Sequence, residues 1–205
     1  MKRLLLIGLL LTLAACTTAP QRPPVANPQH VWEQHQAVLS QLTDWSLSGR
    51  VAIRTDEDGW QFTIQWQQLQ QDYAINLIAP MGQGGVKLNG NDRQVTLLTS
   101  EGESASARNP DQLLERMLGW RVPVTALRYW VLGLPAPGDA VLELDDYGRL
   151  ERLVQGGWTI RFPSYQQVGD LELPTKIFVD NHQASVRLVV GEWVLTPRTS
   201  EATGG

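Results

Sequence analysis

Apolar residues near position 30 recur at the spacing of a helix. Between residues 29 and 42 they fall three or four positions apart, which places them on one helical face. The members of this face are Val31, Trp32, His35, Val38, Leu39 and Leu42. The pattern predicts an amphipathic helix at the start of the folded domain.

The period changes to two immediately afterwards. Apolar and polar side chains alternate through residues 45–53 and 60–66, and the polar residues 56–59 separate the two runs. Shorter runs of the same kind follow at residues 73–77, 86–88 and 95–97. Alternating runs joined by short turns predict an antiparallel meander with one apolar and one solvated face.

Two helices interrupt this meander. Asn109 can cap a helix, Pro110 suits its first position and Gly119 suits its end. A second short helix is expected between Pro123 and Gly133. Strand patterns then resume at residues 140–144, 149–155, 158–165, 171–180 and 184–196. The chain therefore predicts about ten strands and three helices in one domain, without an internal repeat.

The predicted sheet has one apolar face and too many strands to stay flat. Strand twist bends long sheets, so we expect this one to curl around the helices. A core packed only for stability prefers Leu, Ile and Val, since a buried indole N–H needs a partner. The eight tryptophans therefore favour a concave apolar cavity, although an ordinary tryptophan-rich core explains the same periodicity. The residues assigned to the cavity are Trp45, Trp60, Phe62, Ile64, Trp66, Trp130, Trp158 and Ile160.

The N-terminus has the organisation of a secretory signal peptide. Lys2 and Arg3 precede the apolar residues 4–15, a stretch too short for a bilayer, which takes about 20 apolar residues. The motif Leu13-Ala14-Ala15-Cys16 resembles the lipobox of bacterial lipoproteins. The resemblance implies cleavage before Cys16, the only cysteine, and acylation of this residue. Thr17 follows it where an Asp would signal inner-membrane retention, so the resemblance implies the outer membrane.

Composition shifts divide the rest of the chain. Proline is frequent in residues 17–28 and apolar residues are few, which is typical of an extended tether. The predicted organisation is a signal peptide at 1–15, a lipidated cysteine and flexible tether at 16–28, a single domain at 29–197 and a disordered tail at 198–205. Lys and Arg number 17 against 21 Asp and Glu, so the net charge of −4 leaves no electrostatic footprint for nucleic acid.

Candidate catalytic chemistry is sparse. His30, His35 and His182 share no metal-ligand spacing, and no Gly-x-Ser-x-Gly pattern occurs. The glycine-rich run before Lys87 lacks the Ser or Thr and the helix that a phosphate-binding loop requires. We therefore expect neither an enzyme nor a metal or cofactor site.

One turn carries an unusual residue. Pro80 and Gly82 bracket Met81 between two predicted strands, whereas turn residues are normally polar. The methionine either folds back onto the core or is displayed to a partner or bilayer, and the pattern leaves both outcomes open.

Several motifs resemble the LolB family of outer-membrane lipoprotein receptors. They are Trp45-Ser46-Leu47-Ser48-Gly49-Arg50-Val51-Ala52, residues 60–66, Pro80-Met81-Gly82, Leu118-Gly119-Trp120-Arg121-Val122-Pro123 with Leu127 and Trp130, Gly133-Leu134-Pro135, Leu173-Pro174-Thr175-Lys176-Ile177 and residues 186–193. The resemblance covers the signal peptide and essentially the whole domain. It implies a mainly β (α+β) fold: an incomplete antiparallel barrel of about eleven strands over helices, enclosing a hydrophobic cavity.

The resemblance also implies a function. Members of this family accept lipoproteins from the periplasmic carrier LolA and insert them into the inner leaflet of the outer membrane. A LolA-like carrier, acylated lipoproteins and outer-membrane lipid are thus the expected partners of a lipid-anchored monomer on the periplasmic face. The family displays an insertion leucine on a protruding loop, and Met81 stands at that position. Methionine is also large, apolar and flexible.

Two other functions fit the residues alone. One is a lipocalin-like carrier of a small apolar ligand, which would not take acylated protein from a carrier. The other is a structural or assembly lipoprotein whose tryptophan-rich interior is simply filled.

Overall fold

A computed structural model describes residues 23–82 and 84–196 of the chain. The predicted signal peptide, Cys16, the first part of the tether and the C-terminal tail lie outside the described residues.

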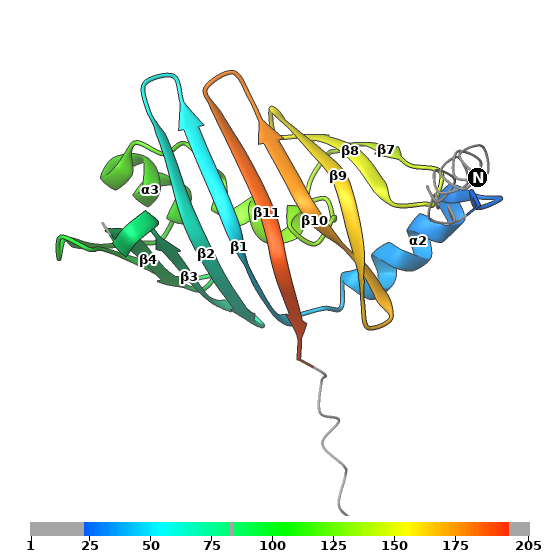
Figure 1. The fold of residues 1–205 in the computed structure, drawn as a ribbon, viewed down its shortest axis with the longest axis horizontal. Coiled ribbons are helices and arrows are strands. Elements are labelled where there is room, and N and C mark those ends of the chain that lie inside the picture. The colour runs from blue at the N-terminus through cyan, green and yellow to red at the C-terminus, as the bar shows by residue number, and fades with distance from the viewer. Residues whose placement is uncertain (1–22, 83, 197–205) are drawn as a thin grey trace, which may run out of the picture.

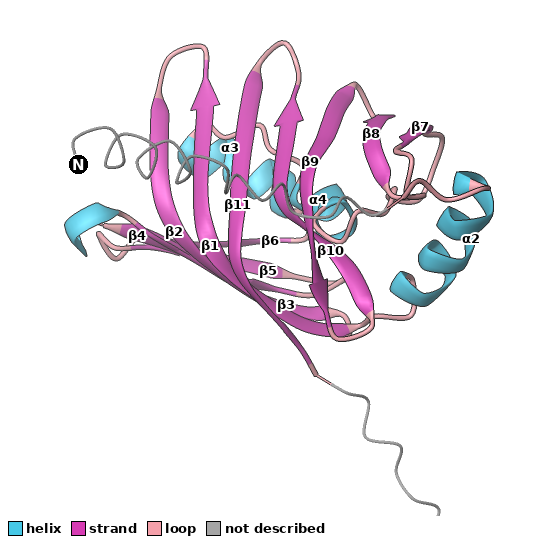
Figure 2. Ribbon diagram, turned by 45° about the vertical axis from the view of Figure 1, so that its right-hand side comes forward, coloured by secondary structure: helices cyan, strands magenta, loops and turns pink. Residues whose placement is uncertain are grey.

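Eleven strands of the described chain form one antiparallel sheet. Their order is β6-β5-β4-β3-β2-β1-β11-β10-β9-β8-β7, so β6 and β7 are its two edges. The strands are β1 (Asp44–Thr55), β2 (Gly59–Leu69), β3 (Asp72–Ile78), β4 (Gly85–Gly90), β5 (Val95–Thr99), β6 (Ser104–Ala107), β7 (Val141–Leu144), β8 (Leu150–Gln155), β9 (Trp158–Val168), β10 (Leu171–Asp180) and β11 (Ala184–Leu195). The sheet curves strongly without closing (Figure 2), which confirms the incomplete barrel.

Three α-helices of the described residues accompany the sheet. Helix α2 (Pro28–Leu39) packs beside β7 at one end of the molecule (Figure 1). Helices α3 (Pro110–Leu118) and α4 (Val124–Trp130) lie in the hollow of the curved sheet (Figure 2). As expected, the Asn109 side chain caps α3 by accepting from the Gln112 amide at 3.1 Å, and Gly119 ends the helix with φ of 70°. No helix within the described ranges is long and apolar enough to cross a membrane.

Two sequence expectations need correction. The first helix ends at Leu39 rather than at residue 42, because the backbone amides of Gln41 and Leu42 bond three residues back and turn the chain into β1. Strand β6 was not predicted at all. Its sequence, Ser-Ala-Ser-Ala, has no large apolar residue to produce an alternating signal, and pairing with β5 defines it.

The long central strands form a continuous apolar inner face. Trp45, Leu47, Val51 and Ile53 of β1 are buried, as the period of two predicted. A register shift beside Gly49 brings β11 unusually close: a Cβ at this position would lie 2.2 Å from a backbone oxygen of β11. Only glycine fits at this position without a shift of the backbone of β11.

Candidate functional site

An apolar cavity lies between the sheet and the two inner helices. Its volume is about 70 Å³, and every side chain around it is apolar. The lining residues are Val51, Ile53, Ile64, Trp66, Ile75, Leu77, Val86, Leu88, Leu114, Trp120, Val122, Val124, Leu127 and Val186. Two of the predicted cavity residues, Ile64 and Trp66, are among them.

Trp120 is a cavity residue that the periodicity analysis did not assign. Its ring lies 5.5 Å from that of Trp60 and 5.6 Å from that of Phe62, centroid to centroid. These two predicted residues therefore pack behind Trp120, which itself lines the cavity. Trp120 sits in the connection between α3 and α4, where no repeating pattern exists to mark an inward residue.

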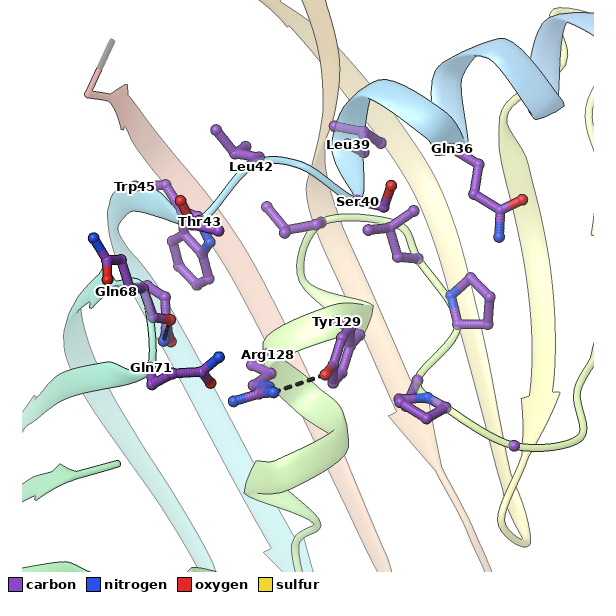
Figure 3. Close-up of a pocket in the computed structure, with 17 residues that line it drawn as sticks. Gln36, Leu39, Ser40, Leu42, Thr43, Trp45, Gln68, Gln71, Arg128 and Tyr129 are labelled. Carbon is purple, nitrogen blue, oxygen red and sulfur yellow. Dashed lines mark hydrogen bonds between the residues drawn. The ribbon is translucent and has the colours of Figure 1, made fainter. Parts of the chain in front are cut away.

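A second aromatic group surrounds Trp45. Its ring centroid lies 5.3 Å from that of Trp66 and 5.5 Å from that of Trp193. Trp45 also borders a larger pocket of about 470 Å³ between β1, the end of α2 and the chain after α4 (Figure 3).

The other predicted cavity residues lie under the opposite half of the sheet. Trp130 and Trp158 pack on one another with ring centroids 6.5 Å apart, and Ile160 is fully buried on β9. The Trp130 indole N–H donates to Oε1 of Gln155 at 3.0 Å. These three residues do not border the apolar cavity as the structure shows it.

A polar recess adjoins the apolar cavity. It measures about 310 Å³ and shares the residues Trp66 and Val124 with that cavity. Tyr73 and Gln68 face each other across the β2–β3 ladder at its wall. Burial, reinforced by Asp111, raises the pKa of the Tyr73 hydroxyl to about 12. This group therefore remains a hydrogen-bond donor at any physiological pH.

The turn between β3 and β4 displays Met81. Its residues form the short helical turn η1 (Pro80–Gly82), beyond the end of the cavity-lining strands (Figure 1). The Met81 side chain is 90% exposed, and its φ of 56° lies in the left-handed region, which costs about 1 kcal/mol or more for a residue with a side chain. Of the two outcomes that the sequence left open, the structure shows the displayed one.

The described residues offer no metal-binding cluster. Among residues 23–82 and 84–196 no group of three or more His, Cys, Asp or Glu could hold a metal ion. An open sheet wrapped over two helices, with an apolar cavity beneath it, defines a structural class of half-barrel proteins that carry an internal apolar site.

Comparison with known proteins specifies this class. The model of the family "Outer membrane lipoprotein LolB" matches residues 43–193. The chain is 43% identical to the outer-membrane lipoprotein LolB of Nitrosococcus oceani over 188 residues, covering 91% of this chain and 94% of the relative. It is 40% identical to the protein of the same name from Alkalilimnicola ehrlichii, covering 95% and 98% of the two chains.

The fold has a solved counterpart outside the family. The crystal structure of a LolA-superfamily protein from Nitrosomonas europaea superposes with a TM-score of 0.53 at 10% identity, covering 84% of this chain and 94% of that chain. At this identity the similarity concerns the fold alone.

The chain belongs to the LolB family of outer-membrane lipoproteins. Family membership assigns it a role in lipoprotein localisation at the outer membrane, and the family consists of transport proteins rather than enzymes.

Proposed function

We propose that this protein is a receptor that accepts lipoproteins from a LolA-type periplasmic carrier and inserts them into the inner leaflet of the outer membrane. It would act as a monomer on the periplasmic face, held there by an acylated Cys16. The observation that carries the proposal is the combination of a wholly apolar cavity with an exposed methionine next to it.

The cavity and the methionine are connected along two strands. Leu77 and Val86 line the cavity and are register partners, and the next pair, Ile78 and Gly85, leads into the turn that carries Met81. An acyl chain leaving the cavity at this end would therefore emerge beside an apolar side chain that can enter a bilayer.

The small size of the cavity indicates how cargo would be released. A volume of about 70 Å³ holds roughly two water molecules and cannot enclose a whole acyl chain. Loading would have to move α3 and α4 away from the sheet and expose apolar surface, at about 25 cal/mol per Å². Closure regains this free energy, so transfer to lipid can run downhill without a nucleotide.

The test is transfer of a purified lipoprotein from its carrier through this protein to liposomes. Met81→Glu should leave lipoprotein bound to the receptor but slow its insertion about tenfold or more, because burying a methionine in lipid gains about 1.5–3 kcal/mol and a carboxylate gains none. Met81→Leu is the matched control and should insert at the normal rate. Normal transfer by Met81→Glu would disprove membrane contact by this turn.

The lipocalin-like alternative is separated by the same assay. A carrier of small apolar ligands would leave the lipoprotein on the periplasmic carrier, with or without the substitution.

A further inference from the structure

Three buried polar atoms in the described part of the chain have no hydrogen-bond partner in the protein. They are the indole nitrogen of Trp66, the Oε1 atom of Gln68 and the hydroxyl of Tyr73. Trp66 and Gln68 are 3% and 4% exposed, so their side chains are almost completely withdrawn from solvent. A buried donor or acceptor without a partner costs about 1–3 kcal/mol, and three such atoms are therefore expensive for the empty protein.

These three atoms belong to one site. Gln68 and Tyr73 are register partners on β2 and β3, and Trp66 lies two residues before Gln68 on the same face of β2. All three side chains line the polar recess of about 310 Å³. Natural proteins pair nearly all buried polar groups, so a concentration of unpaired ones in one recess indicates a ligand.

Local contacts hold two of these groups in place. The Gln68 amide nitrogen donates to the backbone oxygens of Gln70 at 2.9 Å and Asp72 at 3.3 Å, which leaves Oε1 as an acceptor of fixed orientation. The Tyr73 hydroxyl occupies space that only glycine leaves free, since a Cβ on Gly90 would lie 2.5 Å from it. The site therefore holds two donors and one acceptor, and because all three atoms are enclosed in the protein, neighbouring side chains would have to shift for a ligand in the recess to reach them.

The charged side chains of the recess wall are Asp92, Arg108 and Arg128. Arg128 is paired with Asp92 at 3.3 Å and donates to the Tyr129 hydroxyl at 2.7 Å (Figure 3). Arg108 is exposed to solvent. Asp111, which does not line the recess, accepts from the hydroxyl and the backbone amide of Thr125. The three unpaired groups are themselves neutral, so they suit the carbonyl oxygens and the N–H of an ester or amide.

We propose that the recess binds the ester and amide groups that join the acyl chains of a cargo lipoprotein to its N-terminal cysteine. The Trp66 N–H and the Tyr73 O–H would donate to carbonyl oxygens, and Gln68 Oε1 would accept from the amide N–H. The assignment rests on the proposed function, which places the acyl chains in the adjacent apolar cavity. Trp66 and Val124 border both spaces, so a chain in the cavity brings its polar end into the recess.

The recess also leads outwards. Gln68, Arg128 and Tyr129 line both the recess and the larger pocket of about 470 Å³ (Figure 3). The protein part of the cargo would leave through this pocket, at the opposite end of β3 from Met81. Acyl chains would then point towards the bilayer and the polypeptide away from it.

The experiment compares two synthetic lipopeptides by calorimetry on the mature chain carrying Cys16→Ala. One is an N-acyl-S-diacylglyceryl-cysteinyl peptide, and the other has equal chain lengths but ether and amine linkages without carbonyls. The wild-type site should prefer the first. Tyr73→Phe and Trp66→Phe each remove one donor. Each should weaken binding of the ester lipopeptide about fivefold to tenfold, whereas loss of the donor should not change the affinity for the ether analogue. Tyr165→Phe, which removes a hydroxyl far from the recess, is the control and should keep the preference.

The outcomes separate the inference from the function on which it rests. If the wild type bound neither lipopeptide, the proposed acyl receptor itself would be wrong. Two outcomes would overturn the recess assignment without affecting the proposed receptor function. One is equal binding of both lipopeptides by the wild type, and the other is an unchanged preference for the ester lipopeptide in Tyr73→Phe. A phosphatidylethanolamine of the same chain length is the last ligand to be compared. If Tyr73→Phe and Trp66→Phe weakened its binding as much as that of the ester lipopeptide, the recess would recognise any glycerol ester rather than acylated cysteine.

Discussion

The two halves of the sheet use the same residue types in opposite ways. In the cavity half, formed by β2–β5 with α3, the polar atoms of Trp66, Gln68 and Tyr73 are buried without partners. In the paired half, formed by β8–β11 with the end of α4, three buried or half-buried aromatic side chains have their polar atoms bonded. There Trp130 donates to Gln155 at 3.0 Å, Trp193 to the backbone oxygen of Pro174 at 3.0 Å and Tyr165 to that of Leu150 at 2.6 Å.

This difference shows what residue type alone cannot. Burial of a tryptophan or tyrosine ring stabilises a fold, but an unpaired polar atom on that ring costs free energy that a ligand can recover. The paired half therefore serves as the rigid frame, while the cavity half sacrifices stability for a binding site. Two pairs of substitutions test this contrast, and a further substitution tests the pH dependence of stability.

The largest effect is expected at Gln155. Its side chain accepts from Trp130 and from the Ala136 amide at 2.9 Å, and donates to the Ala136 oxygen at 2.7 Å. Gln155→Leu leaves three buried groups unpaired and should lower the free energy of unfolding by about 3 kcal/mol, measured by urea denaturation.

The matched control is Gln61→Leu, the same change at an exposed position of β2. It should alter stability by less than about 0.5 kcal/mol. A loss below about 1 kcal/mol for Gln155→Leu would show that the paired half is not the frame of the fold.

A smaller effect should distinguish two tyrosines. Tyr165→Phe removes a paired hydroxyl and should cost about 1–2 kcal/mol, while its ring keeps the contact with Arg149 at 4.8 Å. Tyr73→Phe removes a buried unpaired hydroxyl and should raise the unfolding free energy by about 1 kcal/mol or more, because such a group costs about 1–3 kcal/mol in the folded protein. Equal losses for the two variants in urea denaturation would contradict the contrast between the halves.

The smallest effect concerns pH. Burial lowers the pKa of His35 on α2 below its ordinary value of 6.5; Glu172 raises it and Arg149 lowers it by smaller amounts. The unfolded chain therefore binds the proton of His35 more readily than the folded chain does. The contribution of neutral His35 to the free energy of unfolding is fully present above pH 6.5 and is lost as the pH falls through the folded-state pKa.

His35→Gln should flatten this decline. Urea midpoints measured from about pH 8 down to about pH 5 would show it, and the difference should be small because the side chain is only half-buried. A decline of unchanged steepness in the variant would assign the pH dependence to other groups.

Much of the fold follows from local pattern. The alternation of Trp60, Phe62, Ile64 and Trp66 gave both the strand and its inward face, and Asn109 with Pro110 gave the start of α3. Strand β6 escaped detection because strand pairing, rather than side-chain alternation, defines it. The sequence pattern did not identify Trp120 as a cavity residue for a related reason: its inward position depends on how α3 and α4 are connected over the sheet.

The sequence by itself determined the inner and outer faces of the strands and marked the Pro80–Gly82 turn as unusual, because period and turn chemistry are local properties. Only the tertiary structure decided that Met81 points outwards and that Trp66 lacks the partner that Trp130 has. Hydrogen bonding of a buried side chain depends on residues distant in sequence, such as Gln155 for Trp130. Periodicity cannot encode that pairing, and the difference between core and binding site depends on it.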